Sequence, residues 1–278
     1  MTNTTKPDEQ KEIETVTSAD GTEIAYERSG SGPPLVLVHG AMFDRSIWDI
    51  GEVRLRLAEH TTVYAIDRRN HGDSASADDC SPAAQISDVV AVVESIDEPV
   101  HLLGHSSGAN YAVWAALQTD NIRSVIPHDP AAPPEEDIRA VLKETMEETI
   151  ALIEQGQNEQ ALTTVLNDFV KIAPDELDEL RSSPVWDAHV ETFHQTLLPE
   201  LRVAGEFDWW DLTPFEELST PTLLPVGSES SHKRMAERLH ELLPNSRLTT
   251  LEGYGHFVHL VAPDRYTDEV LSFISEVD

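Results

Sequence analysis

The residues best placed to do chemistry lie in the segment 100–108, which reads VHLLGHSSG. Four mostly apolar residues lead into Gly104, and an apolar helical pattern begins directly after Gly108. This pattern predicts a buried strand, a tight turn and a helix. Because the two glycines lack a Cβ, strand and helix can approach closely while Ser106 is held in a strained conformation between them. We therefore expect the Ser106 hydroxyl to be presented as a nucleophile at the end of a strand.

Two further motifs follow apolar runs in a similar way. A His-Gly pair at 39–40 ends the apolar run 35–38, and a glycine-bearing loop carries His256 after the last expected strand. The three motifs, in the chain order His-Gly at 39–40, G-x-S-x-G at 104–108 and Gly-His at 255–256, resemble the α/β-hydrolase superfamily. The resemblance covers nearly the whole chain, from about residue 13 to its end.

The resemblance implies acyl transfer to water. Ser106 attacks a carbonyl carbon, and His256 accepts the serine proton and later returns it to the leaving group. An acyl-enzyme forms, and water activated by His256 then releases the acid. The backbone N–H groups of Ala41 and Ser107 are implied as the oxyanion hole, which stabilises the negative charge on the substrate oxygen.

The triad acid is the point at which the chain departs from the family pattern. The family usually places an aspartate three residues after the glycine of Val226-Gly227, and Ser230 stands there in this chain. Glu229, one position earlier and one methylene longer than aspartate, is our first candidate. Asp129, at the end of the preceding core strand, is the alternative. Both candidates keep the chain order serine, acid, histidine.

The elements that must position these groups follow from the local pattern. Asp20-Gly21 is a hairpin signal, the continuous apolar runs predict strands buried on both faces, and Ser81-Pro82 predicts a helix start. His39 and the loop 67–74, which looks like the family's Asp-x-Arg-Gly-x-Gly-x-Ser loop, are expected to be structural. The expected strands are 13–17, 22–28, 35–38, 62–66, the strand entering Gly104, 122–128, 221–227 and 247–251. The expected helices are 48–60, 81–96, 109–118, 232–243 and one from about 263.

Together these elements predict an α/β-hydrolase fold, with a mostly parallel sheet flanked by helices and an inserted helical cap. Residues 13–130 and 219–278 are expected to form the core, 131–218 the cap or lid, and 1–12 a mobile tail. Within the cap the periodicity predicts helices over 135–155, 159–172, 174–181 and 186–201. The candidate substrate-pocket residues are Met42, His105, Trp186, Trp209, Trp210 and Phe257.

The composition restricts the possible partners. The formal charge is −32, from 51 acidic and 19 basic residues, and the acidic residues are dispersed along the chain. Nucleic acid and anionic membranes are therefore poor partners, and the scarcity of lysine favours a halophilic protein. Cys80 is the single cysteine, which excludes an internal disulfide and a cysteine metal cluster. The polar start lacks the features of a secretory signal, and we expect a cytoplasmic protein.

These observations predict a serine hydrolase, with a carboxylesterase acting on small or medium esters as the leading interpretation. The expected partner is a small-molecule ester, with no metal or organic cofactor, and either a monomer or a homo-oligomer is compatible with the sequence. C–C bond hydrolases, lactonases and perhydrolases of the same fold are the alternatives, as is a non-catalytic ligand-binding receptor. Haloalkane dehalogenases and epoxide hydrolases are disfavoured, because both use aspartate where Ser106 stands.

Overall fold

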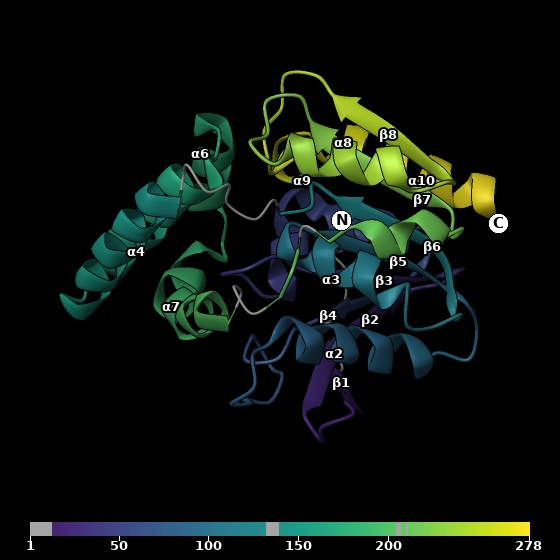
Figure 1. Cartoon of the computed structure of the whole chain (residues 1–278), viewed down its shortest axis with the longest axis horizontal. Coiled ribbons are helices and arrows are strands. Elements are labelled where there is room, and N and C mark those ends of the chain that lie inside the picture. The colour runs from purple at the N-terminus through teal and green to yellow at the C-terminus, as the bar shows by residue number, and fades with distance from the viewer. Residues whose placement is uncertain (1–12, 132–138, 204–206, 210) are drawn as a thin grey trace, which may run out of the picture.

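One eight-stranded sheet organises the chain. The computed structural model describes residues 13–131, 139–203, 207–209 and 211–278. The strands lie in the order β1-β2-β4-β3-β5-β6-β7-β8 (Figure 1). Their bounds are β1 Ile13–Thr17, β2 Glu23–Gly30, β3 Pro34–Val38, β4 Thr62–Ile66, β5 Val100–His105, β6 Ile122–His128, β7 Thr222–Gly227 and β8 Ser246–Leu251.

The sheet is mostly parallel. β2 pairs antiparallel with both β1 and β4, and the pairs from β4 through β3 to β8 are all parallel. The β1–β2 hairpin turns at Gly21, whose φ of 93° lies in the region that favours glycine. The predicted α/β architecture is therefore confirmed. The carboxyl ends of β3, β5, β6, β7 and β8 share one edge of the sheet.

Helices cover both faces of the sheet. In β3, Leu35 and Leu37 pack into one apolar cluster with α1 and α10, whereas Val36 and Val38 pack into a second cluster with α2, α3 and α8. Burial on both sides explains the continuous apolar runs in the sequence. The bounds of these helices, and of η1 and α9, are η1 Arg45–Glu52, α1 Val53–Ala58, α2 Pro82–Glu94, α3 Ser107–Ala115, α8 Lys233–Leu242, α9 Val258–Val261 and α10 Pro263–Val277.

The prediction of a single helix over 48–60 is wrong. The backbone leaves the helical region at Ile50, with ψ of 134°, and at Gly51, with φ of 63°. A Cβ added at Gly51 would lie 3.0 Å from the ring of Pro263, so a larger residue would be both strained and crowded there. The segment therefore divides into η1 and α1 at a glycine whose conformation the helical periodicity did not reveal.

All of the described helices between β6 and η4 Thr213–Glu217 lie in residues 139–203, which we call the helical insertion. Figure 1 shows α4, α6 and α7 standing beside the sheet rather than over one of its faces. The predicted helix 159–172 divides into α5 and a π-helical segment, η2, which ends at Lys171 in a left-handed conformation. The first residues of the predicted helix 135–155 lie outside the described residues. The bounds are α4 Arg139–Glu154, α5 Asn158–Thr164, η2 Val165–Val170, α6 Pro174–Ser182 and α7 Trp186–Val203.

Membrane insertion through a helix finds no support in the part of the chain that the structure describes. None of the helices there combines the length and the apolar character that crossing a lipid bilayer requires. The longest is α7, with 18 residues, and it carries charged residues at both ends.

Candidate active site

Ser106 stands on a sharp turn between β5 and α3. Its backbone has φ of 56° and ψ of −121°, which is strained for a residue with a side chain. The turn requires glycine at both ends. A Cβ at Gly104 would lie 2.2 Å from the carbonyl oxygen of Gly108, and a Cβ at Gly108 would lie 2.4 Å from that of His39, so neither position has room for a side chain. The Ser106 N–H donates to the His128 carbonyl oxygen at 3.1 Å, which ties the turn to β6.

The loop that carries His256 packs directly against this turn. His105, the residue before Ser106, lies 3.0 Å through its Nε2 from the carbonyl oxygen of His256, and the two imidazole rings are 4.6 Å apart. A Cβ at Gly227, the end of β7, would lie 2.0 Å from the Gly255 carbonyl oxygen. The strand end and the loop are therefore in contact, and His256 is 1% exposed.

Asp129 lies beside His256. It follows β6, its side chain is fully buried, and its backbone φ is 46°. Its Oδ1 is 3.4 Å from Nδ1 of His256 and accepts a hydrogen bond from the Ser230 hydroxyl at 2.8 Å. This imidazole–carboxylate separation is within ion-pair distance but long for a hydrogen bond.

Glu229, the first candidate acid, is placed differently. Its side chain is exposed, and its backbone N–H donates to the carbonyl oxygen of Tyr254 at 3.0 Å. The structure thus brings Asp129, and not Glu229, to the ring of His256. Ser230, at the position where the family usually has its aspartate, reaches the same carboxylate from β7.

Burial dominates the protonation of this pair. Loss of solvation raises the pKa of Asp129 to about 7, opposed by His232 and by the Ser230 hydrogen bond. Loss of solvation also lowers the pKa of His256 to about 3. Both shifts have the same cause, because burial disfavours the charged form of each group. The ring is therefore held neutral, which is the form that can accept a proton.

The loop after β3 completes the surroundings of Ser106. A Cβ added at Gly40 would lie 3.1 Å from the Cβ of Ser106, so the Gly40–Ala41 peptide passes close to the serine. Ser107 is the first residue of α3, and the amides of a first helical turn have no partner within the helix. The N–H groups of Ala41 and Ser107 thus belong to two segments that meet at Ser106.

The expected pocket residues do not all come together. Met42, Trp186 and Phe257 pack in one apolar cluster, and the ring of His105 lies 5.0 Å from that of Phe257. Trp209 packs instead with the cluster on the opposite face of the sheet, where its ring is 5.8 Å from that of Tyr111. Trp210 lies outside the described residues. The loop sequence around Trp209 did not indicate which face of the sheet this ring covers.

Three buried histidines, His105, His128 and His259, could hold a metal ion, because one nitrogen of each lies within 4.8 Å of the others. Tetrahedral zinc, with Zn–N near 2.0–2.1 Å, needs nitrogens only about 3.4 Å apart. The group would have to contract to bind zinc. Burial holds the pKa of each ring well below its usual range, so these rings are neutral.

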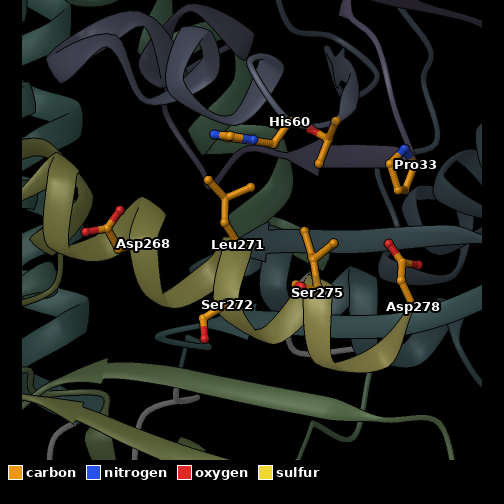
Figure 2. A pocket seen from close by; sticks show the side chains of 9 residues that line it. Pro33, His60, Asp268, Leu271, Ser272, Ser275 and Asp278 are labelled. Carbon is orange, nitrogen blue, oxygen red and sulfur yellow. The ribbon is translucent and has the colours of Figure 1, made fainter.

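Two surface hollows lie at the other edge of the sheet. The larger, of about 610 Å³, is lined by residues that include Pro33 and Thr61, directly before β3 and β4. Figure 2 shows Pro33 and His60 on one side of it and α10 on the other. The second is lined by Pro221 and Ser246, at the starts of β7 and β8. Both are at the amino ends of parallel strands, whereas Ser106 follows a carboxyl end.

Several contacts of the site were not anticipated from the sequence. Glu176, on α6 of the insertion, is buried and accepts a hydrogen bond from the Phe257 N–H at 2.8 Å. Burial raises the pKa of this carboxyl to about 7. His232 lies with its ring 4.7 Å from that of His256. Of the residues that contact the site unexpectedly, only Ser230 could have been singled out from the sequence, because it occupies the position where the family usually has its acid.

Known proteins resemble this chain over most of its length. The profile described as "Alpha/beta hydrolase family" matches residues 35–269. The crystal structure of an alpha/beta hydrolase from Sphaerobacter thermophilus DSM 20745 has a TM-score of 0.77 and 31% identity, covering 94% of this chain and 100% of that one. The sn-1-specific diacylglycerol lipase ABHD11 of Mus musculus is 26% identical over 267 residues, which are 87% of this chain and 81% of that protein. The esterase RhEst1 from Rhodococcus sp. ECU1013 shares the fold, with a TM-score of 0.74, 24% identity, and coverage of 96% and 99%.

Proposed function

Because this chain belongs to the α/β hydrolase family, we propose that it is a serine hydrolase that cleaves carboxylic esters. Ser106 is the nucleophile, His256 the base and Asp129 the acid. The main support for this proposal is the buried carboxylate of Asp129, whose Oδ1 lies 3.4 Å from Nδ1 of His256. The loop that carries His256 is in turn in contact with the Ser106 turn. Asp129 replaces Glu229 as the preferred acid, because the Glu229 side chain is exposed.

The reaction proceeds in two halves. Ser106 Oγ attacks the ester carbonyl carbon while Nε2 of His256 takes the hydroxyl proton, and the N–H groups of Ala41 and Ser107 stabilise the oxyanion. The proton then passes to the leaving alcohol, and the acyl group stays on Ser106. Water, deprotonated by His256, attacks this acyl-enzyme and releases the carboxylic acid. Asp129 holds the imidazole orientation and stabilises the imidazolium without accepting its proton.

Apolar residues near the site favour a substrate with an apolar acyl or alcohol part. Met42, Trp186 and Phe257 are buried in one cluster that joins the sheet to the helical insertion. Burying each methylene of a substrate in such surroundings contributes about 0.8 kcal/mol. The helical insertion would act as the cap that shapes this pocket. The esterases and lipases among the similar proteins support an ester substrate.

A series of p-nitrophenyl esters tests this proposal. The wild-type protein should hydrolyse acetate, butyrate or octanoate esters, and Ser106→Ala should lose nearly all of this activity. Removal of the serine nucleophile costs roughly a million-fold in kcat in a well-studied protease. Circular dichroism controls for folding of the variant. A folded Ser106→Ala protein that keeps more than a few per cent of wild-type activity would contradict the mechanism.

A further inference from the structure

We infer that Arg68 and Glu200 are positioning residues that orient the Gly40–Ala41 peptide and so connect the helical insertion to the oxyanion hole. The inference rests on the proposed function, since it concerns the amide of Ala41. The residues involved come from three elements that are far apart in the sequence: the loop after β3, the loop after β4 and α7.

The carbonyl oxygen of Gly40 accepts two hydrogen bonds. His39 Nε2 accepts from the backbone N–H of Arg68 at 3.0 Å, so the proton of this neutral ring is on Nδ1. Nδ1 therefore donates to the Gly40 oxygen at 2.8 Å. The Arg68 guanidinium donates to the same oxygen through Nη2 at 3.0 Å. Two donors, one of them charged, thus fix this carbonyl.

The orientation of the carbonyl determines that of the neighbouring amide. The Gly40 C=O and the Ala41 N–H belong to one planar trans peptide and point in opposite directions. Fixing the oxygen on the Arg68 side therefore aims the N–H away from Arg68. Donation to the carbonyl also polarises the peptide, which strengthens the N–H as a donor. An oxyanion-hole amide is effective because it is oriented before charge develops on the substrate.

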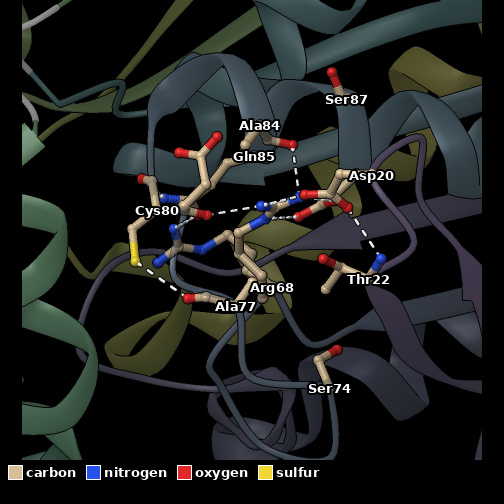
Figure 3. A network of polar contacts seen from close by, with 12 residues as sticks. Asp20, Thr22, Arg68, Ser74, Ala77, Cys80, Ala84, Gln85 and Ser87 are labelled. Carbon is tan, nitrogen blue, oxygen red and sulfur yellow. Dashed lines mark hydrogen bonds and ion pairs between the residues drawn. The ribbon is translucent and has the colours of Figure 1, made fainter.

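Arg68 is itself held by the insertion. It is 1% exposed, so its charge needs a partner. Nη1 donates to Oε1 of Glu200 on α7 at 2.9 Å, and the Glu200 side chain is only 12% exposed. The guanidinium also lies over the ring of Tyr111, 5.2 Å from its centre, and donates to Gln85 (Figure 3). Glu200 is the carboxylate that neutralises Arg68 at this position.

The position of α7 and the orientation of the Ala41 N–H are therefore linked. When Glu200 no longer pairs with Arg68, the buried guanidinium loses its counter-charge and turns toward other acceptors. This weakens one of the two hydrogen bonds that fix the Gly40 carbonyl and leaves the His39 bond in place. A correctly oriented oxyanion donor stabilises the transition state much more than it stabilises the bound ester. The contribution of Glu200 should accordingly be visible in kcat and in the affinity for a tetrahedral adduct, with little change in KM.

The test compares Glu200→Gln with Glu191→Gln, an exposed glutamate on the same helix. Each variant is assayed with a p-nitrophenyl ester and with an alkyl trifluoromethyl ketone. Ser106 adds to the ketone carbonyl, its proton passes to His256, and the resulting oxyanion needs the same N–H donors. We expect Glu200→Gln to lower kcat and ketone affinity by the same factor, about tenfold, compared with 10²–10³ for complete loss of a donor. Glu191→Gln should match the wild type.

Three outcomes would overturn the inference. One is a Glu200→Gln protein with wild-type kcat and ketone affinity. Another is a loss of activity that follows only the loss of folded protein, with ketone affinity unchanged in the active sites that remain. The third is a shift in KM alone. If Glu200→Gln does not fold, Glu200→Asp, which keeps the charge and shortens the reach, is measured in the same way. A wild type that neither hydrolyses the ester nor binds the ketone would instead refute the proposed function.

Discussion

Ser230 occupies the position where the family usually has its triad aspartate. Its hydroxyl donates a hydrogen bond of 2.8 Å to Oδ1 of Asp129. In the proposed triad the acid therefore follows β6, and the loop after β7 supplies a hydrogen-bond donor to it. The sequence predicted Ser106 and His256 as candidates because each lies in a local motif. It could not choose the acid, because the choice depends on which neighbouring strand end reaches His256.

Exchange of each candidate acid for its amide separates the two. Asp129→Asn should lower kcat by about 10³–10⁴-fold, because the amide favours the wrong tautomer of His256. Glu229→Gln, the matched control, should leave kcat within about twofold, because a single exposed charge is largely screened by solvent. Steady-state kinetics at pH 8 measures both. Two mild effects would mean that neither carboxylate belongs to the triad.

At the scale of elements, adjacency in the sheet assembles the site. β5, β6, β7 and β8 are consecutive neighbours, so the turns after them meet at one edge. Apolar runs and turn residues predicted these strands to within about two residues. The breaks in helices 48–60 and 159–172 were not predictable. The first depends on the conformation of Gly51, and the second on a π-helical segment within an uninterrupted helical period.

The helical insertion contacts both loops that flank Ser106. Glu200 on α7 reaches the loop after β3 through Arg68, and Glu176 on α6 reaches the His256 loop through the Phe257 N–H. Glu176 also accepts from the Ala173 N–H at 3.1 Å through its other oxygen. Helical periodicity placed these glutamates on helices, but it gave no indication that their carboxylates would be buried against the core.

Truncation of Glu176 should destabilise the protein. Glu176→Ala leaves the N–H groups of Ala173 and Phe257 without their acceptor, and each such group that stays buried costs about 1–3 kcal/mol. Glu176→Gln keeps one carbonyl oxygen and should cost less. Asp175→Asn, at an exposed neighbour on α6, serves as the control and should be near neutral. Urea unfolding midpoints decide between these expectations, and equal midpoints for all three variants would show that the Glu176 contacts do not stabilise the fold.

At the scale of the whole molecule, charge is the dominant property. The 51 acidic residues exceed the 19 basic ones by 32. Several of the arginines form ion pairs with carboxylates that are themselves buried. Examples are Arg45 with Asp67 and Arg69 with Asp88. These pairs remove few charges from the surface, so most of the negative charge remains exposed and repels itself.

Stability should therefore rise with salt. The Debye length falls from about 30 Å at 0.01 M to about 3 Å at 1 M, which leaves only near neighbours to repel. Each 1 kcal/mol of stabilisation raises the melting midpoint by about 2–4 °C in domains of 150–250 residues. Between 0.05 M and 2 M potassium chloride we expect a rise on the order of 10 °C. Equal midpoints in a thermal melt would remove the halophilic interpretation and leave the hydrolase assignment untouched.

If Ser106 is an activated nucleophile, the folded protein should react with a fluorophosphonate at this serine. Ser106 Oγ attacks phosphorus, fluoride leaves, and His256 takes the proton, so one phosphonyl group is added per chain. Intact mass and peptide mapping should locate this adduct on Ser106 and not on the adjacent Ser107. Heat-unfolded protein and Ser106→Ala should stay unlabelled. Absence of the adduct in the folded wild type, or equal labelling of Ser106→Ala, would show that Ser106 is not an activated nucleophile.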